Sequence, residues 1–345
     1  MKLCAITNYQ NKGYVNETIT FNKILNSLRI PHNDVYNFNL PNITYSINKN
    51  YTHALIFLDY KISSIDLYNQ FFKELKIPKI FIIDSIPQHN KELNDEFINI
   101  NVNGMVNSFC GLPINYQLLI YNNYADGFIF FNDKDVNLFQ NYYKLTNPKP
   151  ASVIPPPLGD INDIKINFNN MILNKNIGFN GHPSYQSGMF NLLNLIKFNP
   201  KYNLNLYGAH GRDEVLDEMI VNHLTSTSNR IRFKGRLKND EKFFKDNYIY
   251  SNLSIYDTFD YYTFFSLLNG SVPIISDSSG TSLFFKSYPF IVNNSVDSMS
   301  NVLEIINTTS VDDMKEILKT ALEDIKHLNN DNINEQYIKF LNSLW

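Results

Sequence analysis

Short apolar runs alternate with segments of helical periodicity along the first half of this 345-residue chain. The apolar runs predict buried strands, at Leu3–Thr7, Ala54–Leu58, Lys79–Asp84 and Gly127–Phe131. The periodic segments predict helices, at Glu17–Arg29 after an Asn16 cap, Ile65–Leu75 and Asp133–Tyr143. The stretch Asn90–Leu112 is less regular. Alternation of this kind predicts a parallel, doubly wound sheet.

The second half repeats the scheme. Its apolar runs predict strands at Ile177–Phe179, Leu204–Tyr207, Ile231–Phe233, Ser251–Ile255 and Val272–Ile275. Its periodic segments predict helices at Gly188–Ile196, Asp213–Leu224, Tyr261–Leu268, Val296–Ile306 and Val311–Ile325. The pattern therefore predicts a second α/β sheet.

The run Asn147–Gly159 holds five prolines, and because proline fits neither a helix interior nor a central strand, it is the candidate linker. A chain of this length also suggests two domains. We expect Rossmann-like domains at residues 1–160 and 161–330. By fold analogy, residues 331–345 form a terminal helix that packs back on the first domain.

The segment Tyr250–Asn294 is the most informative part of the chain. It contains a strand, a helix ended by Asn269-Gly270, a second strand and a Ser/Gly loop. If the two strands are parallel neighbours, the loops Asp257–Asp260 and Ser276–Ser282 both lie at carboxyl ends of strands. Open α/β sheets bind ligands at that edge, so the segment predicts a ligand site in the second domain.

Composition narrows the function classes. The formal charge of −3 and 43% hydrophobic content fit a soluble globular enzyme with no overall attraction to nucleic acid. Cys4 and Cys110 are the only cysteines, without paired metal spacing, and we expect reduced thiols in the cytoplasm, or in the host cytoplasm if the protein is viral. The apolar start is too short for a signal peptide, and no run spans a bilayer. The seven histidines are scattered and indicate no metal site.

Two carboxylates are candidates for catalysis. Asp84 ends an apolar strand, where partial desolvation in a cleft would raise its pKa toward that of a general base; capping of backbone amides is the alternative. Glu17 opens the first helix, a position that the helix dipole favours for structural reasons alone.

Glycine-containing turns follow several predicted strands. In the turn Gly181–Gly188, backbone amides and the hydroxyls of Ser184 and Ser187 could hold a diphosphate, although such turns are also ordinary connectors. Gly208 and Arg236 also follow strands; glycine permits close approach of a ligand, and arginine suits phosphate or base contact. The sequence contains no Walker loop, and no Gly-x-Gly-x-x-Gly motif follows the first strand. An ATPase and a nicotinamide-dependent enzyme therefore lack their usual sequence support.

These features resemble the T-even phage DNA β-glucosyltransferases, which transfer glucose from UDP-glucose to hydroxymethylcytosine in duplex DNA. The similarity is carried, in order, by Met1-Lys2-Leu3, Asn16–Ile19, Asp84 with Pro87, Ser184 with Ser187-Gly188, Tyr207-Gly208, Gly235-Arg236 and Pro289–Asn294. It implies a GT-B fold, an inverting transfer with Asp84 as general base, and Glu17 near the sugar. It also implies that Ser184 contacts the donor phosphates and that the turn of Arg236 and Leu237 reads uracil.

The chain departs from that family in the donor pocket. Gln186 and Phe190 stand where the family has phosphate-binding arginines, and Thr263 and Ser266 stand where it has an arginine and a ribose-binding glutamate. The turn Gly270–Pro273 is also similar to one in phage α-glucosyltransferases and bacterial cell-surface transferases. The acceptor and the stereochemical outcome therefore stay open.

The sequence thus predicts a GT-B glycosyltransferase, expected to be a monomer, that uses a nucleotide sugar, with UDP favoured. The expected donor-binding residues are Ser184, Tyr185, Gln186, Ser187, Gly188, Gly208, Arg236, Leu237, Asp257, Thr263 and Ser266. A divalent ion could replace the missing arginines. The favoured acceptor is a hydroxymethylated base in phage DNA, contacted by Lys12 and Tyr14; the alternatives are a glycan or lipid-linked sugar, and a non-catalytic binding protein on the same fold.

Overall fold

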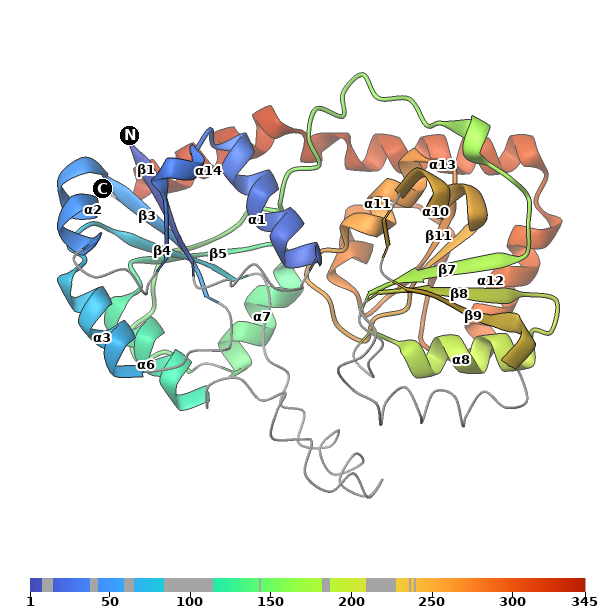
Figure 1. Cartoon of the computed structure of the whole chain (residues 1–345), viewed down its shortest axis with the longest axis horizontal. Coiled ribbons are helices and arrows are strands. Elements are labelled where there is room, and N and C mark those ends of the chain that lie inside the picture. The colour runs from blue at the N-terminus through green and yellow to red at the C-terminus, as the bar shows by residue number, and fades with distance from the viewer. Residues whose placement is uncertain are drawn as a thin grey trace. The chain divides into compact units, whose positions relative to one another are not determined.

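The computed structural model describes residues 1–7, 15–37, 43–58, 65–83, 114–142, 144–181, 187–208, 228–235, 237–238 and 240–344. The chain divides into two compact units (Figure 1). The first contains Met1–Lys12, Phe21–Pro156 and Ile333–Trp345, and the second contains Gly13–Thr20 and Pro157–Asn332. The limits of independently folding domains, expected near residues 160 and 330, remain predictions.

The first unit is built on a six-stranded parallel sheet of order β2-β1-β3-β4-β5-β6. Its strands are β1 (Leu3–Thr7), β2 (Val35–Asn37), β3 (His53–Phe57), β4 (Lys79–Ile83), β5 (Gly127–Phe130) and β6 (Ala151–Val153). Its helices are α2 (Ile43–Asn50), α3 (Ile65–Glu74), α6 (Ile114–Tyr124) and α7 (Asp133–Tyr142), with the part of α1 (Val15–Ser27) that begins at Phe21 and most of α14 (Asn330–Ser343). The predicted doubly wound parallel sheet is confirmed.

Aromatic side chains fill much of the first unit's core. Phe81 of β4 lies with its ring centroid 5.5 Å from that of Phe72 and 5.3 Å from that of Tyr121, and Phe128 lies 5.0 Å from Phe139. Strands β3, β4 and β5 are buried along their whole length, as expected for a parallel sheet covered on both faces. The continuous apolar runs of the sequence follow from this burial.

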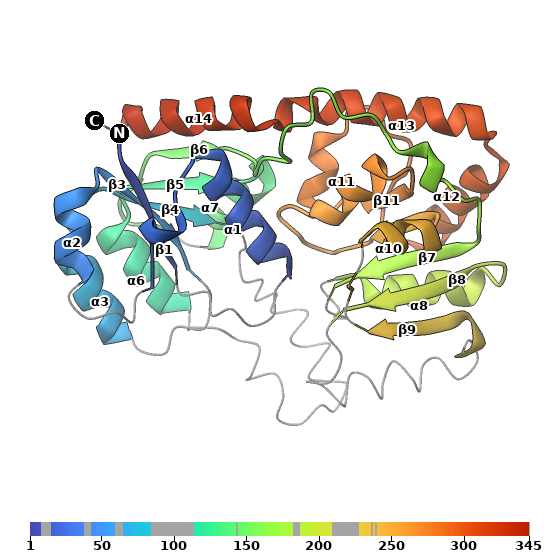
Figure 2. The same cartoon turned by 45° about the horizontal axis from the view of Figure 1, so that its top comes forward.

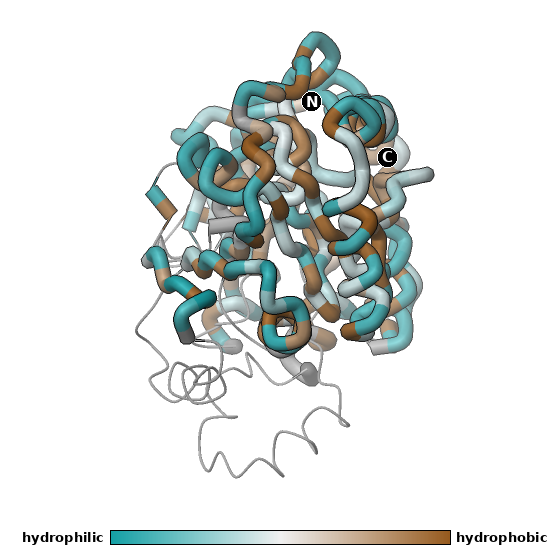
Figure 3. The backbone as a smooth tube through the Cα atoms, turned by 90° about the vertical axis from the view of Figure 1, so that its right-hand side faces the viewer, coloured by the Kyte–Doolittle hydropathy of each residue, from teal (hydrophilic) through white to brown (hydrophobic). Residues whose placement is uncertain are grey.

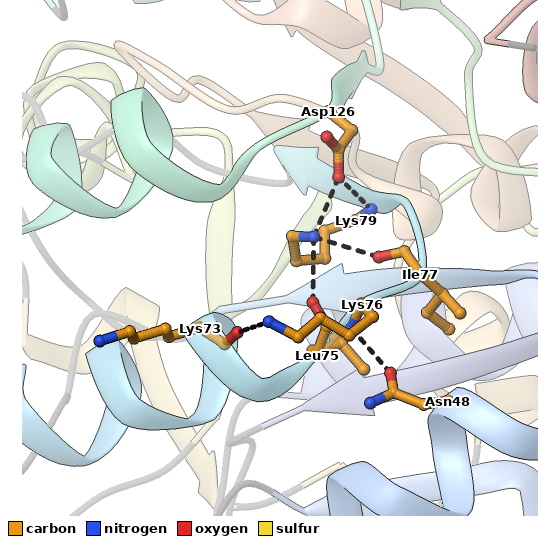
Figure 4. A network of polar contacts seen from close by, with 7 residues as sticks. All are labelled: Asn48, Lys73, Leu75, Lys76, Ile77, Lys79 and Asp126. Atoms are coloured by element: carbon orange, nitrogen blue, oxygen red, sulfur yellow. Dashed lines mark hydrogen bonds and ion pairs between the residues drawn. The ribbon is translucent and has the colours of Figure 1, made fainter.

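A buried lysine fastens the amino end of β4 (Figure 4). The Lys79 ammonium lies 3.1 Å from the Asp126 carboxylate and donates to the carbonyl oxygens of Leu75 and Ile77. The backbone amide of Lys79 donates to the same carboxylate. The end of α3, the start of β4 and the turn before β5 are thereby joined.

The second unit is also a six-stranded parallel sheet, of order β12-β11-β10-β7-β8-β9. Its strands are β7 (Asn176–Asn180), β8 (Asn203–Tyr207), β9 (Ile231–Gly235), β10 (Ile249–Asn252), β11 (Val272–Ser276) and β12 (Ile291–Val292). Its helices are α8 (Met189–Phe198), α10 (Asp240–Asp246), α11 (Tyr261–Leu268), α12 (Val296–Thr308) and α13 (Val311–Ile325). Helices α10 and α11 cover one face of this sheet and α8 covers the other (Figures 1 and 2).

The hydropathy pattern is visible along the backbone, where hydrophobic and hydrophilic stretches alternate (Figure 3). Several sequence expectations need correction. The predicted linker Asn147–Gly159 contains β6, which avoids the proline restriction because it is an edge strand and ends before Pro155. Asn16 lies inside α1, which begins at Val15, so it does not cap the helix. The strand expected at Ser251–Ile255 is β10, which begins two residues earlier, and the expected helix Asp213–Leu224 lies outside the described residues.

Among the helices of the described residues, none has both the length and the apolar composition that crossing a bilayer requires.

Candidate functional site

The strand order of the second unit defines a topological switch point between β7 and β10. From β7 the chain proceeds to β8 and β9 on one side, then returns to β10 and β11 on the other side. The carboxyl ends of β7 and β10 therefore flank the switch point, and open α/β sheets bind ligands in the crevice at such a point. The predicted placement of the loops after β10 and β11 at this edge is confirmed by the parallel pairing of the two strands.

A glycine follows each of the strands β7 and β8 at its carboxyl end. Gly208 follows β8 with a φ of +152°, and a Cβ atom there would lie 2.1 Å from the carbonyl oxygen of Gly181, which follows β7. The Gly208 amide donates to the Gly235 carbonyl at the end of β9, 3.1 Å away. Only glycine fits at position 208, so this residue itself adds no side chain to the edge of the sheet.

Helix α8 begins directly at the switch point. Its N-cap is Gly188, whose φ of +73° lies in the left-handed region and which has no side chain to cap the helix. A Cβ atom at Gly188 would lie 1.8 Å from the carbonyl oxygen of Leu253, the first residue after β10. The amides of the first turn of α8, with the positive end of the helix dipole, are thus held at the crevice, where they suit an anion.

Helix α11 also begins at this edge, but the carboxylate of its N-cap residue offsets the positive end of the helix dipole. The N-cap Asp260 accepts a hydrogen bond from the Tyr262 amide through Oδ1, at 3.0 Å. Its Oδ2 accepts from the hydroxyls of Tyr250 and Thr263, each at 2.8 Å. Of these two helix starts, an anionic ligand would favour α8, since α11 already carries a carboxylate.

The loop after β10 contains a second carboxylate, that of the partly buried Asp257. Asp257 Oδ1 accepts from the Ser279 hydroxyl at 2.8 Å and from the Thr281 hydroxyl at 3.1 Å. Its Oδ2 is buried and has no hydrogen-bond partner among the described residues. The Gly280 amide donates to the Asp257 carbonyl, so the loop after β10 and the turn after β11 are bound together.

Burial controls the ionisation of this region. It raises the pKa of the Asp257 carboxyl, and the hydrogen bonds from Ser279 and Thr281 oppose that shift. Burial, followed by the charge of Asp257, raises the pKa of Asp260 to about 6. The pKa of Tyr250 lies well above its usual value, again mainly because the hydroxyl is buried. Asp260 therefore titrates closer to neutrality than an exposed aspartate does.

The structure locates the other predicted donor residues as follows. Thr263 and Ser266 are fully buried, and the Ser266 hydroxyl donates to the Thr263 carbonyl. Leu237 is partly buried and packs against an aromatic cluster formed by Tyr207, Phe243, Phe244, Tyr250 and Tyr262. Ser187 and Gly188 lie at the start of α8, whereas Ser184, Tyr185, Gln186 and Arg236 lie outside the described residues.

Of the predicted catalytic and acceptor residues, Asp84 and Lys12 belong to the first unit, whereas Tyr14 and Glu17 belong to the segment Gly13–Thr20 of the second unit. Asp84 follows β4, which ends at Ile83, and it lies outside the described residues, as do Lys12 and Tyr14. Glu17 belongs to α1, but its side chain is outside the described part. In this sheet the switch point lies between β1 and β3, and the segment with Lys12 and Tyr14 follows β1 directly.

Sequence reasoning missed the polar residues that organise the site: Asn252, Asp260, Ser279 and Thr281. One signal was present, since Asp260 precedes an apolar helical segment as an N-cap residue does. The described residues contain no group of three or more His, Cys, Asp or Glu side chains that could hold a metal ion.

Comparison with known proteins gives structural matches only. No protein-family model matches the chain, and no curated protein matches it. Anabaena HepE in complex with UDP and glucose has a TM-score of 0.72 and 14% identity, covering 99% of this chain and 100% of that chain. Sucrose-phosphate synthase from Thermosynechococcus elongatus has a TM-score of 0.71 and 11% identity, covering 100% and 99%. A mutant of S. aureus TarM in complex with fondaparinux, α-GlcNAc-glycerol and UDP has a TM-score of 0.60 and 14% identity, covering 84% and 55%.

At these identities the matches establish the fold. Two parallel six-stranded sheets with flanking helices, and full-length similarity to HepE and sucrose-phosphate synthase, assign this chain to the two-domain α/β GT-B fold.

Proposed function

We propose that this protein is a glycosyltransferase that takes its sugar from a UDP-sugar. The observation that carries the proposal is the start of α8, whose N-cap is a glycine held against Leu253 at the switch point of the second unit. The chain shares its fold with HepE, which has been solved with UDP and with UDP-glucose. A nucleoside diphosphate is the chemistry that such a helix start recognises.

In the proposed donor complex, the diphosphate lies at the first turn of α8, near Ser187, with Ser184 in the same connection. The bare backbone at Gly208 allows a close approach of the nucleotide. The turn of Arg236 and Leu237 would read the uracil. Asp257, Thr263 and Ser266 complete the predicted donor set, and the burial of Thr263 and Ser266 suggests that these two act by shaping the pocket wall.

The donor site differs from the predicted relatives in charge. Gln186 and Phe190 replace arginines that would grip the phosphates in a bidentate manner. We therefore expect the helix amides and hydroxyls to bind the diphosphate more weakly than guanidinium groups would, unless a divalent ion accompanies the nucleotide. Titration of UDP with and without magnesium distinguishes the two cases.

For the chemical step we propose inversion at the anomeric carbon, with Asp84 as the general base. A carboxylate after a central parallel strand can remove the proton of an acceptor hydroxyl as that oxygen attacks the sugar and UDP departs. Glu17, in the first turn of α1, would lie near the sugar. Both roles rest on the sequence resemblance and on the position of Asp84 after β4.

We propose a hydroxymethylated base in phage DNA as the acceptor, with Lys12 and Tyr14 near the phosphate backbone. The base would be flipped out of the duplex to reach Asp84. A glycan or lipid-linked sugar is the second candidate, favoured by the net charge of −3 and by the α-GlcNAc-glycerol bound to TarM. A non-catalytic binding protein on the same fold is a third candidate, because the arginines expected in the donor pocket are missing from this chain.

One experiment separates these candidates. The protein is incubated with a panel of UDP-sugars and with hydroxymethylated or unmodified duplex DNA, and UDP release and the mass of the DNA are measured. UDP release with a sugar-sized mass gain only on hydroxymethylated DNA supports the DNA acceptor. UDP release without DNA modification, and without salt-dependent DNA binding, favours a glycan acceptor, whereas UDP binding without any UDP release favours the non-catalytic candidate.

A further inference from the structure

Six polar residues at the carboxyl end of the second sheet form a closed ring of hydrogen bonds, in which the Asp260 backbone amide supplies one link and side chains supply the others. The ring joins the end of β10, the loop after it, the first turn of α11 and the turn after β11. Its members are Asn252, Asp257, Asp260, Thr263, Ser279 and Thr281. We call this set the hydrogen-bond ring.

The ring has two halves that meet at Asn252 and at Asp260. In one half, the Asn252 amide nitrogen donates to the Thr263 hydroxyl at 3.1 Å, and that hydroxyl donates to Asp260 Oδ2 at 2.8 Å. In the other half, the same amide nitrogen donates to the Ser279 hydroxyl at 3.4 Å, which donates to Asp257 Oδ1 at 2.8 Å.

Thr281 closes the ring. Its hydroxyl donates to Asp257 Oδ1 and accepts from the backbone amide of Asp260 at 2.8 Å. Its own amide donates to the Ser279 hydroxyl at 3.1 Å. Each of the three hydroxyl protons in the ring is therefore committed, and all three are directed at a carboxylate oxygen.

The direction of these bonds gives the ring a single arrangement. A carboxylate only accepts, so each hydroxyl that donates to one can only accept from its other neighbour. The Tyr250 hydroxyl donates a further hydrogen bond to Asp260 Oδ2. The members are buried except Asp257, which is partly buried, and a buried polar group without a partner is costly, so alternative loop positions that break these bonds are disfavoured.

We propose that Asn252 and Asp260 are positioning residues for the donor site, which hold the loop after β10 and the turn after β11 in their binding arrangement before the nucleotide sugar arrives. This inference rests on the proposed function. The loop that they hold begins at Leu253, whose carbonyl oxygen packs against Gly188 at the start of α8. Holding this loop therefore fixes the place of the amides that would bind the diphosphate, and a site organised in advance binds more tightly.

The other charged and titratable groups that face Asp260 agree with a role for this carboxylate in holding the loop in place. They are Tyr250 from β10, Tyr262 from α11, and Asp257 from its own loop; Tyr262 in turn donates to Asp240 of α10. None is a cation, so the hydroxyl and amide donors stabilise the carboxylate. Removal of one of these donors should loosen the loop.

Thr263→Val tests the proposal, because it keeps the side-chain shape and removes the hydroxyl that links Asn252 to Asp260. UDP affinity is measured by calorimetry, and the midpoint of thermal unfolding is measured alongside. Ser271→Ala is the matched control, since the Ser271 hydroxyl is equally buried in the same unit and donates to the carbonyls of Phe244 and Asn247 near the amino end of β11. Thr263→Ser restores the hydroxyl.

We expect Thr263→Val to weaken UDP binding by about tenfold, the scale of one or two lost hydrogen bonds. Ser271→Ala and Thr263→Ser should bind UDP as the wild type does, even if Ser271→Ala lowers the unfolding midpoint. Equal UDP affinity in Thr263→Val and wild type, or equal losses in Thr263→Val and Ser271→Ala, overturns the positioning role.

Failure of the proposed UDP-sugar site looks different, because the wild type itself would then bind no UDP. Hydrogen exchange of the unliganded protein still tests the ring in that case. Faster exchange of the Asp260 and Tyr262 amides in Thr263→Val, but not in Ser271→Ala, supports the tie, and unchanged exchange overturns it. If Thr263→Val does not fold, Tyr250→Phe takes its place in both measurements, because this variant also removes one hydrogen-bond donor to Asp260.

Discussion

The backbone of Gly188 packs directly on the carbonyl oxygen of Leu253, so that even one methyl group at position 188 would overlap that oxygen, at 1.8 Å. These residues follow β7 and β10, the two strands that flank the switch point of the second sheet. Their contact sets how far the start of α8 lies from the loop that carries Asp257. The proposed diphosphate site depends on this distance.

Gly188→Ala should therefore destabilise the second unit more than its backbone angle alone requires. The left-handed φ of +73° costs alanine about 1–2 kcal/mol, and the overlap with Leu253 adds about 1–3 kcal/mol. Gly235→Ala is the matched control, because Gly235 has a similar φ of +72° and no heavy atom of the described residues within 4 Å of an added Cβ. Urea unfolding should show a larger loss for Gly188→Ala; equal losses would mean that the Leu253 contact is easily relieved.

Asp260→Asn should change the pH dependence of stability. Burial and the charge of Asp257 raise the pKa of Asp260 from 3.8 to about 6, so the folded state holds a proton that the unfolded chain releases. The stability linked to this proton is complete below the unfolded pKa and is lost as the pH rises through about 6. One pKa unit corresponds to about 1.4 kcal/mol. The free energy of unfolding of the wild type minus that of Asp260→Asn should therefore be larger near pH 4 than near pH 7.5, by about 2–3 kcal/mol.

Urea unfolding of both proteins at these two pH values checks this expectation. A common acid effect from the carboxyl groups that do not interact with Asp260 cancels in the difference between the two proteins. A stability difference that is the same at both pH values, or larger near pH 7.5, would contradict the raised pKa of Asp260.

Lys79 should be a stability residue without a role in donor binding. Its ammonium is buried and bonded to Leu75, Ile77 and Asp126 (Figure 4), while the Asp126 side chain is 47% exposed. We expect Lys79→Ala to cost about 2–3 kcal/mol, because the buried stem leaves a cavity and the two carbonyls lose their donor. Asp126→Asn should cost less than about 1 kcal/mol, since solvent screens the half-exposed carboxylate. Thermal unfolding measures both costs, and a change of UDP affinity in either variant would contradict the assignment.

The sequence predicted the central strands and most of the long helices, although it missed α6 (Ile114–Tyr124). Strands such as β3 and β4 are buried on both faces, so their continuous apolar runs are unambiguous. By contrast, β2 has only three partly buried residues, and α2 mixes polar residues into a short helix, so neither produced a clear pattern. Short elements of this kind form because their neighbours complete them.

The organisation of the site was beyond local reasoning. The bond between Asp257 and Thr281 joins residues 24 positions apart, and it exists because β10 and β11 pair in parallel. Likewise, nothing local to Gly188 indicates that Leu253 lies against it. The residues that could be predicted were those with a local cause, such as glycine after a strand or serine before a helix; the hydrogen-bond ring depends on the tertiary pairing of two loops.

Asp84→Asn tests the proposed general base. If Asp84 deprotonates the acceptor, the variant should lose about 10²–10⁴-fold in kcat, because a positioned base contributes a factor of that size. UDP affinity should stay at the wild-type value, since Asp84 follows a strand of the first unit and the proposed donor site lies in the second. Steady-state kinetics with calorimetry of UDP separates these quantities, and wild-type turnover would remove Asp84 from the mechanism.

Hydrogen–deuterium exchange of the wild-type protein, with and without saturating UDP, tests the central claim most directly. The proposed donor site lies where α8 begins and where the loop after β10 runs from Leu253 to Asp260. We predict that UDP slows exchange in the peptides that cover the first turn of α8 and this loop, and leaves α13 of the same unit unchanged. Binding of UDP with no protection at either segment, or no change in exchange at any UDP concentration, would contradict a UDP-sugar site at this switch point.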